Sequence, residues 1–189
     1  LEAASRVLAR VTAPEVSEFY EALHRQHGVE VFTGVEVEAF AEGACPGRVG
    51  ELKCKDGRAI EADLVVVGVG LLPNVELAEA AGLAVNNGIV IDERGLTSAP
   101  TVVALGDCAS QYHPFYGRHL RLESVPSAIE QARNAAALIC GKPARVTGLP
   151  WFWSDQYDLK LQMAGLSVGH DQLIVRGSTA RRLARTSCP

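Results

Sequence analysis

An acidic residue beside a glycine follows one of the apolar runs of the sequence. The run at 101–105 is typical of a strand buried in a sheet, and Gly106 and Asp107 come directly after it. In α/β folds, ligands bind at the carboxyl edge of the sheet, where these two residues would lie. A carboxylate accepts hydrogen bonds from sugar hydroxyl groups, and glycine allows close approach. The pair predicts a site for a sugar-containing cofactor; the alternative is an ordinary Gly-Asp turn.

Two further glycines, Gly68 and Gly70, end a second apolar run at 64–67. A continuous apolar run suits a strand that is covered on both faces, as in a parallel sheet. Glycines at the end of such a strand allow a cofactor to come close to the backbone. The alternative is a chain crossing that simply needs small residues.

The strongest helical pattern covers 127–140 and is closed by Gly141. Ser124, Val125 and Pro126 stand immediately before it. The start of a helix presents free N–H groups and the positive end of the helix dipole, which stabilise negative charge. We expect these three residues to face an anionic group, although the same helix must also pack on the sheet.

Three adjacent aromatic residues, Trp151, Phe152 and Trp153, begin the last part of the sequence. Because neighbouring side chains of a strand point to opposite faces, at least one of them should be exposed or should line a cleft. An exposed tryptophan usually marks an interface. The alternative is a hydrophobic linker between domains.

Composition excludes several classes of protein. With a net charge of -4 and no basic stripe, the 189-residue chain is not expected to bind nucleic acid. No apolar run approaches the ~18 residues of a membrane span. The five cysteines show neither a C-x-x-C pair nor a metal-ligand spacing, which predicts reduced thiols in a cytoplasmic protein, without a dithiol centre or a metal site.

Local patterns predict an α/β protein. The first helix is expected to begin at a capping box formed by Thr12 and Glu15 and to end at Gly28. A short helix is expected at 77–81 and a turn at 86–88. The expected strands, besides the two apolar runs, are 29–32, 35–40, a hairpin at 49–60 with an Asp56-Gly57 turn, 89–91, 151–154, 159–163 and 173–175.

The stretch 97–109, Thr-Ser-Ala-Pro-Thr-Val-Val-Ala-Leu-Gly-Asp-Cys-Ala, resembles the second flavin-binding motif of flavoproteins with two dinucleotide-binding domains. Residues 1–178 are similar throughout to the bacterial ferredoxin reductases of the putidaredoxin reductase type, in the pyridine nucleotide-disulfide oxidoreductase superfamily. The resemblance implies a partial Rossmann-like flavoprotein with the start of a C-terminal α+β interface domain. It also implies hydride transfer from NADH to FAD, and then electron transfer to a [2Fe–2S] ferredoxin of a monooxygenase or dioxygenase system.

The resemblance assigns roles to individual residues. Asp107 would hold the ribityl chain of FAD, and the helix start at Ser124, Val125 and Pro126 would stabilise the reduced flavin. Gly68 and Gly70 would lie near the nicotinamide. Glu2, if it ends a Rossmann strand, would bind the adenosine ribose and favour NADH over NADPH; otherwise it is a solvated acid. Trp153 would cover the flavin on the side of the ferredoxin, with Arg133 as a cation facing that partner. No catalytic side chain is implied, because the flavin carries the chemistry.

The resemblance also divides the chain. It implies an NAD-binding part at 1–72, an FAD-binding part at 73–147, a truncated interface domain at 148–178 and a tail at 179–189 outside the family. Both G-x-G-x-x-G fingerprints are missing, and the chain begins at Leu1 with no signal peptide, so we expect a fragment. The Arg-rich tail lacks strand alternation; we expect it to be disordered and attribute it to a frameshift or truncation.

Two alternative functions remain open at this stage. An NADH oxidase or a rubredoxin reductase would share the Gly106-Asp107 motif, and the string 151–156 favours the ferredoxin reductase over both. A truncated remnant without catalytic activity is the other alternative. Bound flavin in the purified protein would separate a flavoenzyme from the inactive remnant.

Overall fold

The chain forms two compact units. The computed structural model describes residues 1–144, 148–176 and 184–188. The first unit comprises Leu1–Val69 together with Leu166–Pro189, and the second comprises Gly70–Gly165. Among the described residues, none of the helices has the length and apolar character needed to cross a membrane.

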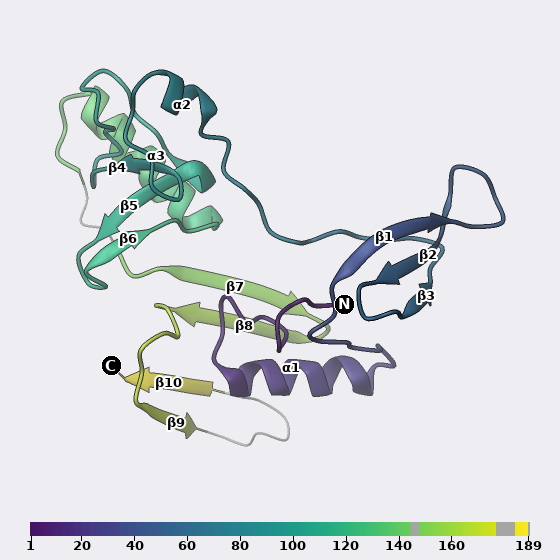
Figure 1. Cartoon of the computed structure of the whole chain (residues 1–189). Helices are drawn as coiled ribbons and strands as arrows, with labels where there is room; N and C mark the ends of the chain where they lie inside the picture. Colours follow the sequence, from purple (N-terminus) through teal and green to yellow (C-terminus); the bar gives the residue numbers. More distant parts are fainter. Residues whose placement is uncertain (145–147, 177–183, 189) are drawn as a thin grey trace. The chain divides into compact units, whose positions relative to one another are not determined.

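The N-terminal part of the first unit, Leu1–Val69, contains one described helix and a three-stranded antiparallel sheet (Figure 1). Helix α1 spans Pro14–Gln26 and buries Ser17 and Tyr20. Strands β1 (Val37–Glu42), β2 (Val49–Cys54) and β3 (Ala59–Glu61) follow in that spatial order. The predicted hairpin at 49–60 is confirmed, because β2 pairs with β3 across a turn in which Gly57 has a φ of +87°.

The start of α1 differs from the predicted capping box. The N-cap is Ala13, and it offers no side-chain hydrogen bond to the helix. Thr12 instead turns back and donates to the carbonyl oxygen of Leu8 at 3.2 Å, and its hydroxyl lies 3.3 Å from that of Ser17. Arg6 donates to the same Ser17 hydroxyl at 2.6 Å. The hydroxyl of Thr12 is thus used by the preceding turn, and it ties that turn to the first turn of the helix.

Two predicted strands near the N-terminus need correction. The stretch 29–32 is not a strand; its residue 32 only accepts a hydrogen bond from the N–H of Glu2, beside a single parallel bridge between Glu2 and Thr33. The strand expected at 35–40 begins two residues later, at Val37. Pairing with β2 begins at Val37, opposite Cys54, so the pairing partner rather than the local pattern decides where this strand begins.

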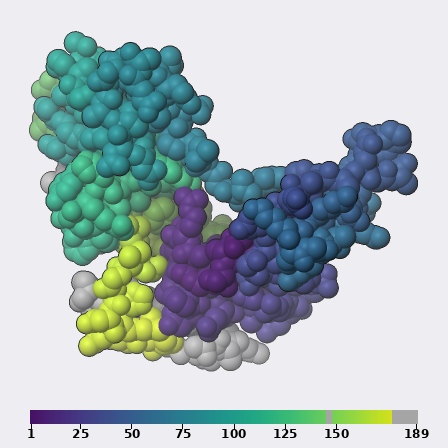
Figure 2. All heavy atoms as spheres, in the orientation of Figure 1, coloured from purple at the N-terminus to yellow at the C-terminus, as the bar shows by residue number. Residues whose placement is uncertain are grey.

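The buried strand predicted at 64–67 is wrong. This segment pairs with no described strand, and three of its four apolar side chains are exposed, with Leu64 at 78% and Val66 at 86%. Figure 2 shows it as a thin band of atoms. An apolar run becomes a buried strand only when other strands pair along its edges and helices cover its faces, and no described strand pairs with this segment.

The second unit contains a mixed three-stranded sheet covered by the long helix. Strand β5 (Ala109–His113) lies between the parallel β4 (Ile89–Ile91) and the antiparallel β6 (Arg118–Leu120). The core consists of Ile91, Ala104 and the fully buried Ala109. The remaining elements are helix α2 (Glu76–Ala80), the 3₁₀ turn η1 (Gly106–Cys108), helix α3 (Val125–Ile139), and the hairpin β7 (Trp151–Gln156) with β8 (Leu159–Ala164). The expected helices at 77–81 and 127–140, the turn at 86–88 and the strands at 89–91, 151–154 and 159–163 are confirmed.

The expectation for the C-terminal tail is wrong in part. Strand β9 (Gln172–Arg176) confirms the strand predicted at 173–175, and it pairs antiparallel with β10 (Ala184–Cys188). The tail therefore does supply a strand, because backbone hydrogen bonds pair two strands without any apolar alternation. The disorder expected for 179–183 falls on residues outside the described part of the chain.

Candidate functional site

The Gly106-Asp107 pair begins a 3₁₀ turn that precedes a strand, instead of following a strand. The stretch 101–105, predicted as a buried strand, makes only an isolated bridge between Leu96 and Val103, and Leu105 is 40% exposed. The 3₁₀ turn η1 follows, and β5 begins directly after it. The prediction of a buried strand that ends at Gly106 is thus wrong for the described residues, which pair with 101–105 only through this one bridge.

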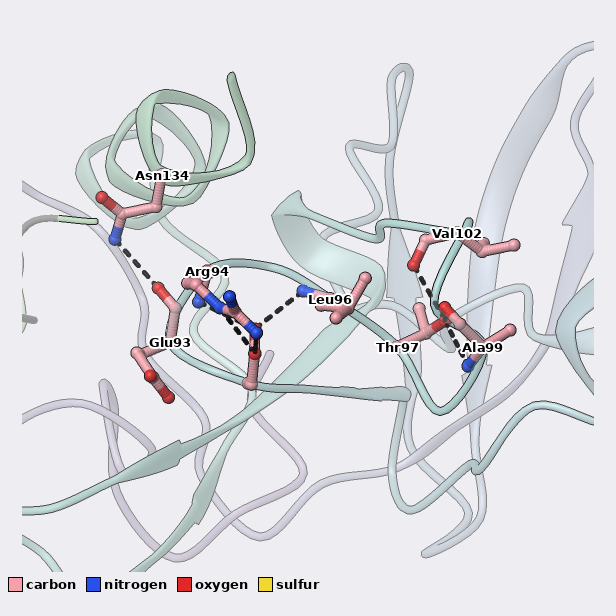
Figure 3. Close-up of polar contacts among 8 residues, drawn as sticks. Glu93, Arg94, Leu96, Thr97, Ala99, Val102 and Asn134 are labelled. Carbon is pink, nitrogen blue, oxygen red and sulfur yellow. Dashed lines mark hydrogen bonds and ion pairs between the residues drawn. The ribbon is translucent and has the colours of Figure 1, made fainter. Parts of the chain in front are cut away.

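A turn stabilised by Asp92 leads toward this pair (Figure 3). The Asp92 carboxylate accepts from the N–H groups of Arg94, at 2.8 Å, and Leu96, at 2.9 Å, and it forms an ion pair with the Arg94 guanidinium at 3.1 Å. Partial burial acts to raise the pKa of Asp92, but these hydrogen bonds and the guanidinium charge together hold the pKa below its ordinary value. The turn is anchored on α3 because the buried Asn134 side chain donates to the carbonyl oxygen of Glu93 at 3.0 Å.

A second anchor in the same loop is the buried hydroxyl of Thr97. It donates to the carbonyl oxygens of Val102, at 2.9 Å, and Ala99, at 3.2 Å, as Figure 3 shows. The Thr97 N–H also bonds to the Val102 carbonyl oxygen at 3.0 Å. These bonds close the loop 97–102 and fix the direction in which the chain enters Gly106 and Asp107.

At the pair itself the backbone is bound and the carboxylate is free. Gly106 has a φ of +79°, a conformation that favours glycine, and its N–H donates to the Oε1 of Gln131 at 2.7 Å. The carbonyl oxygen of Asp107 accepts from Arg121 at 3.2 Å. The Asp107 side chain is exposed, and none of the described residues bonds to its carboxylate. The arrangement presents an acceptor to a ligand from a rigid backbone.

Two residues that support the pair were not found from the sequence. Gln131 is buried on α3 and donates from its Nε2 to Gln111 at 3.4 Å, so it links α3, η1 and β5. Arg121, whose side chain is 8% exposed, forms an ion pair with Glu123 at 2.9 Å. The only local signal was a cation two residues before an acid, which is typical of countless surface segments.

Helix α3 begins at Val125, two residues before the predicted start, so Val125 and Pro126 lie in its first turn. Ser124 is the N-cap, and its hydroxyl accepts from the N–H of Ser127 at 3.4 Å, while Pro126 occupies the first turn. Val125 is 60% exposed. Ser124 and Pro126 line a small hollow with Trp151 and with side chains from β5 and β6. The full lining is Gln111, His113, Leu120, Leu122, Ser124, Pro126, Ser127, Glu130, Gln131, Gly148, Leu149, Pro150 and Trp151.

The tryptophans of β7 point to its open face, as the strand alternation predicts. Trp153 is 47% exposed and Trp151 is 42% exposed, whereas Phe152 between them is less accessible. The two indole rings stack with centroids 5.2 Å apart. Arg133 is exposed on α3. Gly106, Asp107, the start of α3 and both tryptophans therefore belong to one compact unit.

Two of the three predicted nucleotide residues belong to the other unit. Glu2 and Gly68 belong to the first unit, and Gly70, with a φ of +87°, begins the second. Glu2 is half-buried, and its Oε1 accepts from the N–H of Ala4 at 2.8 Å. Gly68 is exposed, and a Cβ added to it would meet no atom within 4 Å. Among the described residues, no group of three or more His, Cys, Asp or Glu side chains is placed to hold a metal ion.

Replacing Gln131 with leucine is expected to destabilise the second unit by about 1–3 kcal/mol, because the Gly106 N–H and the Gln111 amide would lose a buried partner. Urea unfolding of the chain, followed by tryptophan fluorescence, measures this effect, since both tryptophans lie in β7. Arg133→Leu, at an exposed position of the same helix, serves as the control and should leave the midpoint nearly unchanged. Equal midpoints for all three proteins would contradict the supporting role of Gln131.

Comparison with known proteins gives two family matches along the chain. A model described as pyridine nucleotide-disulphide oxidoreductase matches residues 1–135, and one described as reductase C-terminal matches residues 151–187. The second match extends past residue 178, where the resemblance was expected to end.

Similar proteins are found among both curated sequences and solved structures. Putidaredoxin reductase CamA of Pseudomonas putida is 54% identical over 181 residues, which cover 96% of this chain and 43% of the relative. The 5,5'-dehydrodivanillate O-demethylase ferredoxin reductase subunit of Sphingobium sp. is 47% identical, with coverages of 96% and 44%. The structure of a covalent putidaredoxin reductase–putidaredoxin complex matches with a TM-score of 0.92 and 52% identity, over 98% of this chain and 45% of that one. The chain thus spans less than half the length of these relatives.

Proposed function

The chain belongs to the pyridine nucleotide-disulphide oxidoreductase family. We propose that it is part of an FAD-dependent reductase that carries electrons from NADH to a [2Fe–2S] ferredoxin. The observation that carries the proposal is the clustering, in one unit, of the free Asp107 carboxylate, the start of α3 and the exposed tryptophans of β7. Two of the similar proteins are named as reductases of ferredoxin-type partners, which supports the same reading.

The residues of this cluster fit a flavin. The exposed Asp107 carboxylate is free to accept hydrogen bonds from ribityl hydroxyl groups, and nothing lies within 4 Å of the position that a Cβ of Gly106 would take. The start of α3 at Ser124, Val125 and Pro126 offers the positive end of its dipole to negative charge. Bound FAD would supply the exchange between a two-electron donor and a one-electron acceptor. The protein would hold and orient it and exclude water from one face through Trp153.

Within this proposal, the chain divides as its resemblance implies. Residues 1–72 would contribute to the NAD-binding domain, 73–147 to the FAD-binding domain and 148–178 to the interface domain. The family match over 151–187 supports extending the interface domain past 178, into the stretch expected to lie outside the family. Gly68 and Gly70 would lie near the nicotinamide. Arg133 and Trp153, both exposed, would form part of the surface that meets the ferredoxin. A cytoplasmic location is proposed because all four cysteines with described side chains, Cys45, Cys54, Cys108 and Cys140, are free thiols.

The proposal is tested on a full-length chimera, in which residues 1–189 replace the matching segment of the Pseudomonas putida relative. We expect the purified chimera to be yellow, with about one FAD per polypeptide, and its flavin absorbance to be bleached by NADH under anaerobic conditions. A folded chimera without flavin would contradict the proposal, because the segment would then fail to support the cofactor.

Glu2 makes a prediction about the choice of nucleotide. In the chimera, Glu2→Gln should lower the ratio of kcat/KM for NADH to that for NADPH by about tenfold, because a carboxylate no longer repels the 2′-phosphate. Glu38→Gln, at an exposed position of β1, is the matched control and should leave the ratio unchanged. If Glu2→Gln also leaves the ratio unchanged, Glu2 serves only the bond to Ala4.

A further inference from the structure

His113, the last residue of β5, has a buried side chain that is 4% exposed. Its Nε2 lies 3.1 Å from the carbonyl oxygen of Gly148. Because a carbonyl oxygen can only accept, Nε2 must carry the hydrogen and donate it. The other ring nitrogen, Nδ1, is buried without a partner among the described residues. The ring is therefore held in the protein by its bond to the segment that leads into β7.

The same peptide segment is held from a second element. The N–H of Gly148 donates to the Oε1 of Glu130 on α3 at 3.4 Å. Side chains of β5 and α3, which are far from Gly148 in the sequence, thus bind both backbone groups of this residue. Gly148 lies two positions before Pro150.

The end of the β7–β8 hairpin is bound to the same segment, which leads into β7. The N–H of Gly165, directly after β8, donates to the carbonyl oxygen of Pro150 at 2.7 Å. A Cβ added at Gly165, whose φ is +82°, would lie 3.1 Å from the hydroxyl of Tyr116. The Tyr116 ring in turn packs against the His113 ring with centroids 4.9 Å apart. Both ends of the hairpin therefore converge on His113 and Tyr116.

We propose that His113, Tyr116 and Glu130 form a clasp that positions the β7–β8 hairpin. The hairpin carries both tryptophans of the chain, so the clasp sets where Trp151 and Trp153 lie relative to the start of α3. These three are positioning residues, since they act on the tryptophans only through the hairpin backbone. The consequence for electron transfer rests on the proposed function; the mechanical role does not.

Amide hydrogen exchange of the 189-residue chain measures the clasp directly. His113→Phe keeps a ring against Tyr116 but removes the donor to Gly148, and loss of one buried hydrogen bond should speed exchange of the amides in 149–165 about fivefold. His113→Gln restores an N–H donor and should return exchange close to the original rate. His119→Phe, on the exposed β6, is the matched control and should change nothing. The amides of β1 and β2, in the first unit, serve as the internal reference.

Unchanged exchange of 149–165 in His113→Phe would overturn the proposal, as would failure of His113→Gln to restore it. If His113→Phe unfolds the whole second unit, Glu130→Ala decides, because alanine maintains the helix and removes only the acceptor for Gly148. Faster exchange confined to 149–165 supports the clasp, and exchange equal to that of the unchanged chain overturns it.

In the chimera, the ratio of kcat/KM for ferredoxin to that for ferricyanide distinguishes positioning of the tryptophans from a purely structural role of His113. There, His113→Phe should lower kcat/KM for a [2Fe–2S] ferredoxin about fivefold more than that for ferricyanide, and His113→Gln should restore the ratio. Equal losses would show that the clasp does not act on the partner-facing tryptophans. Failure of the proposed function itself would appear differently, as absence of ferredoxin reduction by the unmodified chimera.

Discussion

Asp107→Ala is expected to weaken FAD binding by the chimera about tenfold to a hundredfold, because a charged acceptor for the ribityl hydroxyls is lost at a cost of ~1.5–3 kcal/mol. The structure supports this size of effect in two ways. The Asp107 carboxylate is exposed with no bond to a described residue, so removal leaves no other group unpaired. Its backbone is held by Arg121 and by the bond from Gly106 to Gln131, so the substitution should not disturb the turn.

The measurement is a titration of the flavin-free chimera with FAD, followed by flavin fluorescence. Asp107→Asn retains a neutral acceptor and should fall between the original and the alanine variant. Glu79→Ala, an exposed acid on α2 in the same unit, is the control for a general change of charge. An unchanged FAD dissociation constant for Asp107→Ala would show that the carboxylate does not contact the cofactor.

The second large effect is expected at Trp153. Trp153→Ala should lower kcat/KM for a [2Fe–2S] ferredoxin about thirtyfold, the cost of removing a tryptophan at the centre of an interface. Reduction of ferricyanide, a small acceptor that needs no docking surface, should fall much less. The open position of Trp153, 47% exposed and stacked on Trp151, makes it available to a partner protein.

Both activities are measured on the same preparation of the chimera, so that differences in flavin content cancel. Trp153→Phe retains an aromatic ring and should recover a large part of the ferredoxin activity. Equal losses with both acceptors would assign Trp153 to packing or to support of the flavin, and they would remove it from the proposed docking surface.

Elements with strong local chemistry were predictable from the sequence. The helix α3 has a serine N-cap at Ser124 and a glycine with positive φ at Gly141, and both signals act within a few residues. The turn at Asp56 and Gly57 fixes its hairpin in the same way. The alternation of Trp151, Phe152 and Trp153 predicted that at least one ring would be open, and two are. In these cases the atoms that decide the structure are close together in the chain.

The errors have the opposite origin. The runs at 64–67 and 101–105 have the composition of buried strands, but a strand forms only beside partners, and the described residues supply none. The strand at Ala184–Cys188 was missed because its pairing with β9 uses backbone groups that composition does not reveal. Gln131 and His113 were missed because they act on Gly106 and Gly148, residues 25 and 35 positions away in the sequence.

The most direct test of the proposed function is whether the chimera passes electrons from NADH to a [2Fe–2S] ferredoxin. Under anaerobic conditions, catalytic amounts of the chimera should bleach the visible iron–sulfur absorbance of an excess of ferredoxin when NADH is added. Arg133→Glu, which reverses the charge of the proposed partner-facing cation, should slow this bleaching and leave ferricyanide reduction nearly unchanged. A chimera that holds FAD, is reduced by NADH and reduces ferricyanide, but reduces no ferredoxin, would contradict the account.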